Sequence, residues 1–297
     1  MNISGKELYH WQQQAKGRAI ADCIDPHEVD WLLQTVTNLS SLSLRLGSWQ
    51  HQSEIECRKS LLELNQLWQQ RLQERIPVQY LVETVFWRRF QLKVTPAVLI
   101  PRPETELIID LAQTAREQNN LSLEAKQNWV DLGTGSGAIA LGLAASFPQA
   151  TIHAVDVSCE ALNIAQENAI NCKLSENIRF YQGSWWQPLK HLQAQVTGMV
   201  SNPPYIPTAV IEQLQPEVVK HEPHLALDGG KDGLDAIRYL VQTAPQYLIK
   251  RGIWLIEIMQ GQAPAVVNLL QQQGEYEDIQ VFQDLSGIER FILAFKK

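Results

Sequence analysis

The tetrapeptide Asn202-Pro203-Pro204-Tyr205 places two hydrogen-bond acceptors beside an aromatic ring. The two prolines fix φ and lack a backbone N–H, so the carbonyl of Pro203 is free to point into a site. The side-chain oxygen of Asn202 is the second acceptor. Together these oxygens can take both hydrogens of an NH₂ group, while Tyr205 lies flat against its plane. The tetrapeptide therefore predicts a binding site for a planar amide or an exocyclic amino group.

Such a site suits methyl transfer to nitrogen. An amide nitrogen is a poor nucleophile because its lone pair is delocalised into the carbonyl. Holding both N–H bonds turns the lone pair toward the methyl donor, and the proton can leave after the nitrogen has become cationic. Orientation and electrostatics then carry the catalysis without a strong base. We assign catalytic roles to Asn202, Pro203 and Tyr205, and Pro204 joins them in holding the substrate.

A glycine-rich loop upstream predicts the cofactor site. It follows an apolar strand ending at Leu132 and opens a helix at Ala138. Glycines let the backbone turn sharply and leave no side chain between it and a ligand, which would lie at the carboxyl end of the strand. We expect cofactor contacts from the loop residues Gly133, Thr134, Gly135, Ser136 and Gly137.

The spacing of these glycines favours S-adenosylmethionine over a dinucleotide. An acid, Asp156, ends the next strand about 25 residues on, where it can accept both ribose hydroxyls of either cofactor. The dinucleotide fingerprint requires a third glycine three residues after the second. Here Gly133, Gly135 and Gly137 are each two residues apart. The loop and Asp156 therefore predict an S-adenosylmethionine site.

Alternating strands and helices must position these two motifs. Such alternation indicates a mostly parallel sheet with helices on both faces. The predicted helices span 107–116, 138–146, 160–171, 234–249 and 263–273. The predicted strands span 129–132, 151–157, 178–181, 198–201 and 253–258, with two more near Ile279 and Phe291.

The N-terminal third predicts a separate helical bundle. Helices are expected from Ser4 to Ala21, from Asp25-Pro26 to Val36, and over 51–74, where apolar residues recur at helical spacing. Their tryptophans, Trp11, Trp31 and Trp68, are expected in its core. Two strands, 79–82 and 86–94, would then form a β-hairpin. The expected domains are 1–75 (helical), 76–98 (hairpin linker) and 99–297 (methyltransferase).

Composition and charge narrow the class of partner. The chain has a net charge of −7, whereas a nucleic-acid enzyme usually carries a basic face. No apolar run approaches the length of a membrane span, and the polar N-terminus lacks the features of a secretory signal. The four cysteines have no metal or redox spacing. We expect a cytosolic monomer that binds neither membrane nor nucleic acid, has no metal site and acts on a protein or small molecule.

Over nearly its full length the chain resembles the peptide chain release factor glutamine N(5)-methyltransferases. The Pro-Arg-Pro-Glu-Thr-Glu stretch, together with the Glu-Pro and Asp-Gly-Leu segments, makes the resemblance more specific than the methyltransferase motifs alone. The matching segments are 77–81, 99–106, 131–141, 201–206, 221–223, 226–227 and 229–234.

The resemblance implies a fold, a substrate and a cofactor. The fold is a Rossmann-like class I S-adenosylmethionine-dependent methyltransferase domain with an N-terminal helical bundle and a β-hairpin. The substrate is the glutamine of the Gly-Gly-Gln motif of class I release factors. Residues 202–205 would hold this glutamine, and the N-terminal helical domain would engage the release factor. The implied cofactor contacts come from residues 133–137, Asp156 and Trp185. Trp185 could instead cover the sheet edge, and Glu104 and Glu106 are favoured at a helix start in any case.

Three alternatives stay open at this point. A glutamine methyltransferase of a ribosomal protein would share the tetrapeptide chemistry. An adenine-N6 nucleic-acid methyltransferase would use the same tetrapeptide on an exocyclic amine. The net negative charge of this chain argues against that alternative, because nucleic acid is itself negatively charged. A non-catalytic binding module on the same fold would not need the intact loop, Asp156 and Asn202. The chain also departs from the family pattern: Met259 and Glu83 stand where glycine is common, and Glu289 where aspartate is usual.

Overall fold

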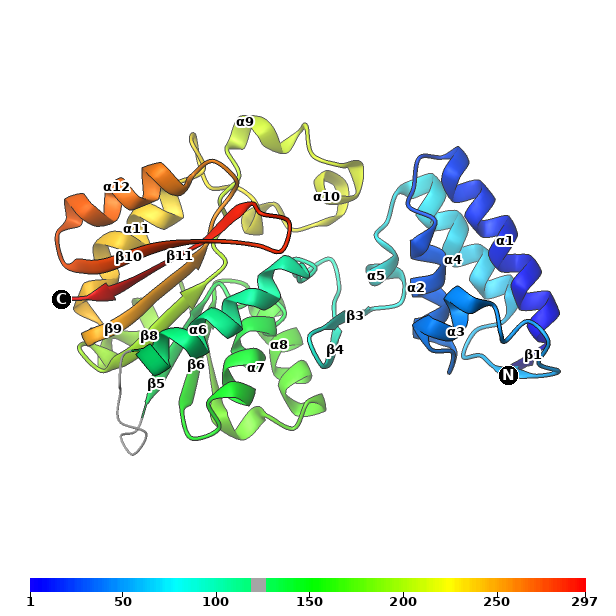
Figure 1. The fold of residues 1–297 in the computed structure, drawn as a ribbon, viewed down its shortest axis with the longest axis horizontal. Coiled ribbons are helices and arrows are strands. Elements are labelled where there is room, and N and C mark those ends of the chain that lie inside the picture. Colours follow the sequence, from blue (N-terminus) through cyan, green and yellow to red (C-terminus); the bar gives the residue numbers. More distant parts are fainter. Residues whose placement is uncertain (119–126) are drawn as a thin grey trace. The chain divides into compact units, whose positions relative to one another are not determined.

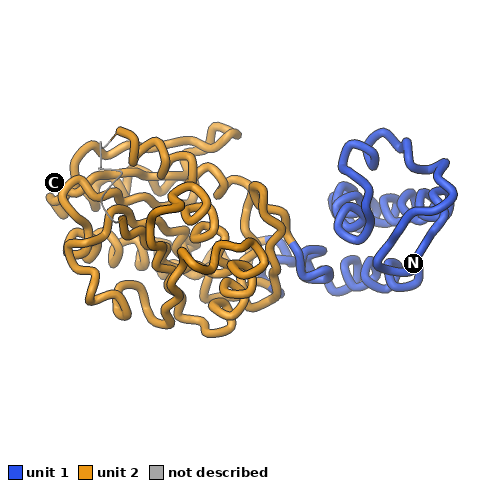
Figure 2. The backbone as a smooth tube through the Cα atoms, turned by 90° about the horizontal axis from the view of Figure 1, so that it is seen from below, with its two compact units in different colours: residues 1–84, 215–221 blue, residues 85–214, 222–297 orange. Residues whose placement is uncertain are grey.

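The computed structural model describes residues 1–118 and 127–297 and comprises two compact units (Figure 2). The first unit contains Met1–Thr84 and a second segment, Gln215–His221. The second unit contains Val85–Leu214 and Glu222–Lys297. The chain therefore passes from one unit to the other three times, after Thr84, Leu214 and His221.

The first unit is a helical bundle, as predicted. Its core includes Trp11 and Trp68, and the Trp68 indole N–H donates to the Ala15 carbonyl at 3.2 Å, while Trp31 is partly buried against this core. A two-stranded antiparallel ribbon joins β1 (Asn2–Ile3) to β2 (Ile55–Glu56). The helices are α1 (Gly5–Ala21), α2 (His27–Val36), α3 (Ser41–Leu46), α4 (Leu61–Glu74), α5 (Val78–Leu81) and α10 (Pro216–His221).

Ion pairs hold α10 in this bundle although it lies far along the chain. The buried Arg71 donates through Nε to Glu28 Oε2 at 2.5 Å and through Nη1 to Glu217 Oε1 at 2.8 Å. Arg75 Nε lies 3.2 Å from the same Glu217 oxygen. These contacts explain why a short segment from the C-terminal half belongs to the N-terminal unit.

Two predictions about the N-terminal region are wrong. The helix expected over 51–74 begins at Leu61, because Ser60 and Glu63 form a reciprocal capping box, with the Ser60 N–H donating to Glu63 Oε2 at 2.7 Å. The strand expected over 79–82 is the short helix α5, since an apolar run of this length does not separate helix from strand.

A hairpin is present, but it does not use the predicted pair of strands. It pairs β3 (Thr84–Trp87) with β4 (Phe90–Lys93), and the stretch 86–94, predicted as one strand, is divided by a turn at residues 88–89. Glu83, just before it, has a φ of 51°, in the left-handed region that favours glycine. Glycine, common at this position in the resembling family, suits this backbone better than glutamate does.

The second unit contains a seven-stranded sheet in the order β10-β11-β9-β8-β5-β6-β7 (Figure 1). The five strands from β9 to β7 run parallel, and β10 and β11 pair antiparallel at one edge. This confirms the predicted mostly parallel sheet. The strands are β5 (Asn128–Leu132), β6 (Thr151–Asp156), β7 (Ile178–Gln182), β8 (Val196–Ser201), β9 (Leu248–Glu257), β10 (Tyr276–Gln283) and β11 (Glu289–Lys296).

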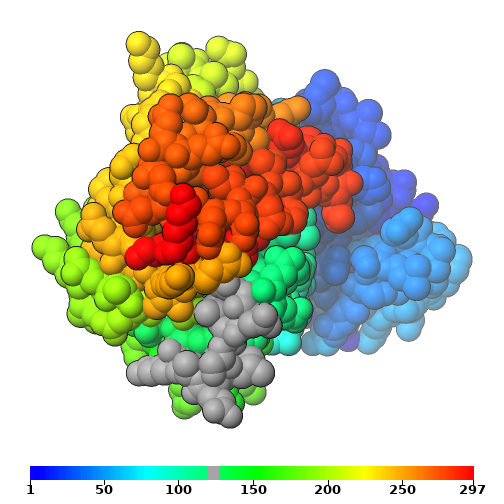
Figure 3. Space-filling model, turned by 60° about the vertical axis from the view of Figure 1, so that its left-hand side comes forward, coloured from blue at the N-terminus to red at the C-terminus, as the bar shows by residue number. Residues whose placement is uncertain are grey.

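Helices cover both faces of this sheet, as the alternation predicted. Figure 1 shows α6 (Leu107–Gln118), α7 (Ala138–Ser146) and α8 (Cys159–Asn171) on one face, and α11 (Asp235–Thr243) and α12 (Ala263–Gln273) on the other. Figure 3 shows α12, β10 and β11, orange to red, side by side on the surface of this unit. The helix predicted to reach 249 ends at Thr243, because Pro245 follows and β9 begins at Leu248.

The order of the sheet brings four strand ends together. Adjacent parallel strands β6, β5, β8 and β9 end at Asp156, Leu132, Ser201 and Glu257. The connections reverse direction between β5 and β8, and open α/β sheets bind ligands at such a point, outside the carboxyl ends of their strands. The glycine loop and the tetrapeptide follow β5 and β8, so they meet at this edge.

Among residues 1–118 and 127–297, none of the helices has the length and apolar character that a bilayer crossing requires.

Candidate functional site

The glycine loop after β5 is anchored to the neighbouring strand and helix. The N–H groups of Gly133 and Thr134 both donate to the Val155 carbonyl at 2.9 Å. Gly137 has a φ of 84°, and a Cβ there would lie 3.2 Å from Ala165 Cα, so a larger residue would push the loop away from α8. At Gly135 a Cβ would meet no described atom within 4 Å. The loop is therefore fixed on the side that faces β6 and α8, and it has open space at Gly135.

Asp156 contacts this loop directly. Its Oδ2 accepts from the Gly135 N–H at 2.8 Å, and its Oδ1 accepts from the Ser158 N–H at 2.9 Å. Burial raises the pKa of Asp156, while these backbone hydrogen bonds lower it. The partly buried carboxylate keeps further lone pairs on both oxygens, so it can still accept hydroxyl hydrogens.

Asp131, which the sequence reasoning did not assign to the site, is a fully buried acid beneath the loop. Its Oδ2 accepts from Thr134 Oγ1 at 2.6 Å and from the Ala140 N–H at 3.0 Å. Its Oδ1 has no hydrogen-bond partner among the described residues. Burial raises the pKa of Asp131 to about 7. The signal that could have identified it is an acid in the strand that leads into the glycine loop.

The two adjacent tryptophans have different environments. Trp186 is fully buried and stacks on Tyr247, with 4.3 Å between ring centroids. Trp185 is only partly buried and has a φ of 52°, an outlier for a bulky residue. A Cβ on Gly133 would lie 3.8 Å from the Trp185 ring. Trp185, rather than Trp186, thus presents an aromatic ring beside the loop.

The tetrapeptide leaves the end of β8, next to the end of β5. Ser201 Oγ donates to the Leu132 carbonyl at 2.6 Å, which fixes the two strand ends to each other. The Asn202 side-chain NH₂ faces Thr105 Oγ1 at 3.5 Å. Within the described chain, Asn202 Oδ1 and the Pro203 carbonyl accept no hydrogen bond. Both oxygens therefore keep their capacity to accept hydrogen bonds.

Tyr205 is held at both ends. Its hydroxyl donates to Glu257 Oε1 at 3.1 Å, and its backbone carbonyl accepts from Gln262 Nε2 at 2.9 Å. Burial, and then the Glu257 charge, raise the pKa of the Tyr205 phenol, so it stays protonated at neutral pH. Because the hydroxyl is committed to Glu257, Tyr205 offers a ligand only its ring.

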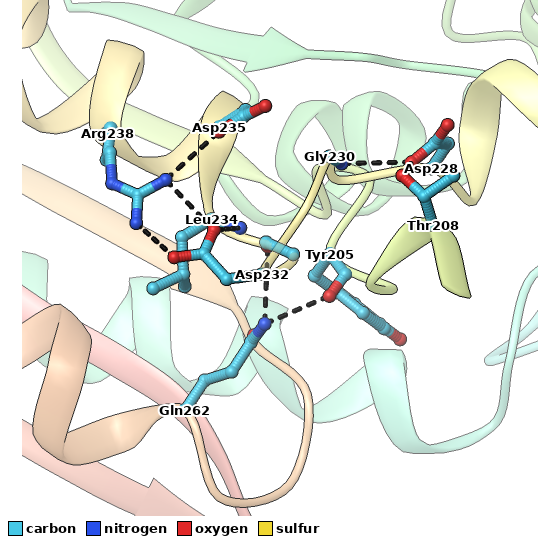
Figure 4. Close-up of polar contacts among 10 residues, drawn as sticks. Tyr205, Thr208, Asp228, Gly230, Asp232, Leu234, Asp235, Arg238 and Gln262 are labelled. Atoms are coloured by element: carbon cyan, nitrogen blue, oxygen red, sulfur yellow. Dashed lines mark hydrogen bonds and ion pairs between the residues drawn. The ribbon is translucent and has the colours of Figure 1, made fainter. Parts of the chain in front are cut away.

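The Asp-Gly-Leu segment supports the tetrapeptide (Figure 4). Gln262 Nε2 also donates to the Gly233 carbonyl at 3.2 Å, which joins that segment to Tyr205. A Cβ on Gly233 would lie only 2.2 Å from the Tyr205 carbonyl oxygen. Next to it, Asp228 Oδ1 accepts from Thr208 Oγ1 at 2.7 Å and from the Gly230 N–H at 2.9 Å. The Asp-Gly-Leu segment, one of those that made the resemblance specific, therefore helps to fix Tyr205 in the predicted substrate site.

The Pro-Arg-Pro-Glu-Thr-Glu stretch contacts the same region. Arg102 Nη2 donates to both oxygens of Glu222, at 2.7 and 2.8 Å, and burial raises the pKa of that carboxyl while Arg102 lowers it. Glu104 is exposed, whereas Glu106 accepts from the Arg88 N–H at 2.7 Å in the hairpin turn. Glu106 therefore has a structural role, which its position at a helix start did not reveal.

Comparison with known proteins gives close relatives over the whole length. A family model described as "Methyltransferase small domain" matches residues 117–231. A release factor glutamine methyltransferase of Synechocystis is 54% identical, and the match covers 98% of this chain and 97% of the relative. The proteins of that name from Thermosynechococcus vestitus and Gloeobacter violaceus are 47% and 43% identical, over 98% and 96% of this chain and 99% and 96% of theirs.

Solved structures confirm the fold class at much lower identity. The hMettl16 catalytic domain in complex with MAT2A 3'UTR hairpin 6 superposes with a TM-score of 0.56 at 13% identity, covering 89% of this chain and 88% of that one. The delta-N METTL16 methyltransferase domain gives 0.51 at 15% identity, over 70% and 88%. The predicted Rossmann-like methyltransferase fold is thus confirmed, and these identities carry no information about the substrate.

Proposed function

The chain belongs to the release factor glutamine methyltransferase family, and from this premise we propose that it methylates the glutamine of the Gly-Gly-Gln motif in class I peptide chain release factors. The methyl group would come from S-adenosylmethionine and go to the side-chain amide nitrogen. One observation carries the proposal: Asn202 Oδ1 and the Pro203 carbonyl are unpaired neighbours within the described chain, while Asn202 NH₂ faces Thr105. Because neither oxygen has a donor within the described chain, the pair can accept the two hydrogens of a substrate amide NH₂ group.

The residues around the glycine loop fit S-adenosylmethionine. The unpartnered Asp131 Oδ1 could accept from the ammonium of a methionine group, and the open space over Gly135 admits a ligand to the backbone. Asp156 would accept from ribose hydroxyls, and the Trp185 ring would lie against adenine. The bound cofactor would supply an electrophilic methyl group on a sulfonium.

The chain's own residues then orient the nucleophile. Asn202 Oδ1 and the Pro203 carbonyl each accept one amide hydrogen, which directs the nitrogen lone pair toward the donor and favours the pyramidal nitrogen of the transition state. Pro204 and the Tyr205 ring pack against the amide plane. Tyr205 keeps its proton for Glu257, so it is not a general base. After methyl transfer the cationic amide nitrogen releases one of its two protons to solvent water.

Asp156→Ala tests the cofactor part of the proposal. We expect binding of S-adenosylmethionine to weaken by about 1.5–3 kcal/mol, the range for hydrogen bonds to a charged group, because the ribose would lose its acceptor. Isothermal titration calorimetry of parent and variant measures the difference, with NAD as a second ligand. Tight NAD binding without S-adenosylmethionine binding would contradict the assignment.

We propose that the helical domain, residues 1 to about 75, selects the release factor. A chain lacking these residues also carries Glu217→Gln, because the partners of Glu217, Arg71 and Arg75, are removed with them. It is expected to bind S-adenosylmethionine like the parent but to methylate intact release factor far more slowly, because the glycine loop and tetrapeptide lie outside the removed part. Cofactor affinity and methylation rate are measured on the same preparations. Equal methylation of intact release factor by both chains would assign the domain another role.

The decisive experiment follows labelled methyl transfer from S-adenosylmethionine to candidate substrates. Purified class I release factor, ribosomes and DNA are offered separately. The proposal expects label only in the release factor, and mass spectrometry should map the added methyl to the Gly-Gly-Gln peptide. A release factor in which that glutamine is replaced by alanine should take no label. Label in a ribosomal protein or in DNA would identify the alternative substrate classes instead.

A further inference from the structure

A short chain of hydrogen bonds runs from Asn202 into the protein interior. Asn202 Nδ2 faces Thr105 Oγ1 at 3.5 Å, and Thr105 Oγ1 donates to Glu257 Oε2 at 2.6 Å. Thr105 is 4% exposed and Glu257 is 1% exposed. These residues come from the Pro-Arg-Pro-Glu-Thr-Glu stretch and the end of β9, remote in sequence from the tetrapeptide. They contact Asn202 through its NH₂ group, from the protein interior.

The direction of each hydrogen bond in this chain follows from its buried end. An ionised carboxylate only accepts, and the Tyr205 hydroxyl already donates to the other Glu257 oxygen at 3.1 Å. The single Thr105 hydroxyl proton is committed to Glu257, which leaves an oxygen lone pair toward Asn202. Only the NH₂ end of the Asn202 amide can bind that lone pair. The amide oxygen, Oδ1, is thereby turned the other way.

Opposing influences act on the Glu257 carboxyl. Burial, the largest of them, raises the pKa of Glu257 above its usual value, and the nearby Glu104 charge acts in the same direction. The hydrogen bonds from Thr105 and Tyr205 and the charge of Arg290 lower that pKa, and Arg290 Nε is itself held by Asp284 Oδ2 at 2.7 Å. Even a Glu257 proton on the Tyr205 side would leave Oε2 free to accept from Thr105.

We propose that Thr105 and Glu257 are positioning residues that decide which end of the Asn202 amide faces the substrate. Asparagine has nearly equal shapes in its two amide orientations, so sterics alone do not choose between them. In the reversed orientation, Asn202 would point its own NH₂ at the substrate NH₂, two donors facing each other. This inference deepens the proposed function, on which it rests.

The first test compares two substitutions of Thr105. Thr105→Val keeps the shape but removes both the donor to Glu257 and the acceptor for Asn202, and kcat for methylation should fall about 10- to 100-fold. Thr105→Ser keeps the hydroxyl and should retain most of the parental kcat. Thr197→Val, a buried threonine near the start of β8, is the matched control and should leave kcat unchanged. S-adenosylmethionine affinity should be the same in all four chains.

A double-mutant cycle separates positioning from a general structural role. If Thr105 acts through Asn202, adding Thr105→Val to Asn202→Ala should cause no further loss, because there is no amide left to orient. If Thr105 only stabilises the fold, the two losses should multiply. Glu257→Met, which removes the acceptor for the Thr105 hydroxyl, should behave like Thr105→Val in the same cycle. Should that buried substitution prevent folding, the Thr105 pair and its cycle still decide the proposal.

Two results would overturn the inference: near-parental kcat in Thr105→Val, or losses that multiply in the cycle. Both are distinct from failure of the proposed function, which concerns the parent chain. If the parent methylates a substrate other than release factor, the proposed function is wrong. The cycle measured on that substrate still shows whether Thr105 and Glu257 orient Asn202.

Discussion

Asn202→Ala is expected to lower kcat for release factor methylation by about 10²–10³-fold, equivalent to about 2.7–4 kcal/mol, the usual cost of one preorganised catalytic interaction. The variant loses one of two acceptors, so the substrate amide keeps a free N–H and its lone pair is no longer aligned. Cofactor affinity should change much less, because the glycine loop and Asp156 remain. Single-turnover methylation and calorimetry on the same preparation separate these two effects.

Asn202→Asp tests whether an acceptor oxygen alone is sufficient at this position. It keeps an acceptor oxygen but adds a negative charge near the sulfonium, which would strengthen ground-state cofactor binding without helping the transition state. We expect more activity than in the alanine variant and less than in the parent. Turnover close to the parental value in the alanine variant would show that Asn202 does not orient the nucleophile.

Gly233→Ala is expected to damage both the fold and the site. A Cβ at this position would lie 2.2 Å from the Tyr205 carbonyl oxygen and 2.7 Å from Gln262 Nε2, and the backbone φ is 76°. Left-handed backbone costs a non-glycine residue about 1–2 kcal/mol, and overpacking adds about 1–3 kcal/mol. The free energy of unfolding should therefore fall by about 2–5 kcal/mol, and kcat should fall because Tyr205 must move.

Gly287→Ala is the matched control for that substitution. Gly287 has nearly the same φ, 78°, but a Cβ there meets no described atom within 4 Å. It should lose only the backbone contribution and keep full activity. Denaturant unfolding and methylation assays on both variants isolate the clash with Tyr205. Equal stability and activity in the two variants would mean that the tetrapeptide tolerates displacement.

The parts of the site that could be predicted from sequence are those encoded within a few residues. The glycine loop and the tetrapeptide are continuous segments, each directly after a strand, so local spacing was enough to identify them. Thr105, Glu257 and Gln262 were missed because their roles depend on contacts between distant segments. Thr105 and Glu257, which share the 2.6 Å hydrogen bond, are 152 residues apart.

The error at residues 79–82 has a local origin. Residues 79–82 are aromatic and β-branched, which favours a strand, yet α5 forms there after Pro77, whose carbonyl accepts from the Tyr80 and Leu81 N–H groups. Local propensity is a weak guide over so few residues. The departure at Met259 is also explained only by contacts: its N–H donates to Gln262 Oε1 at 3.0 Å, and its φ is not positive. The resemblance could not tell whether this position required glycine.

The threefold passage of the chain between its units constrains how this enzyme can be recombined. Residues 215–221 belong to the helical unit, yet they are encoded between two parts of the methyltransferase unit. In a chimaera that exchanges only the N-terminal segment, the residue at position 71 would come from one parent and the residue at position 217 from the other. The Arg71–Glu217 ion pair would then be lost unless both parents contain it. A graft that preserves this ion pair must therefore carry two separate stretches of sequence, and the helical unit cannot be transplanted at a single junction.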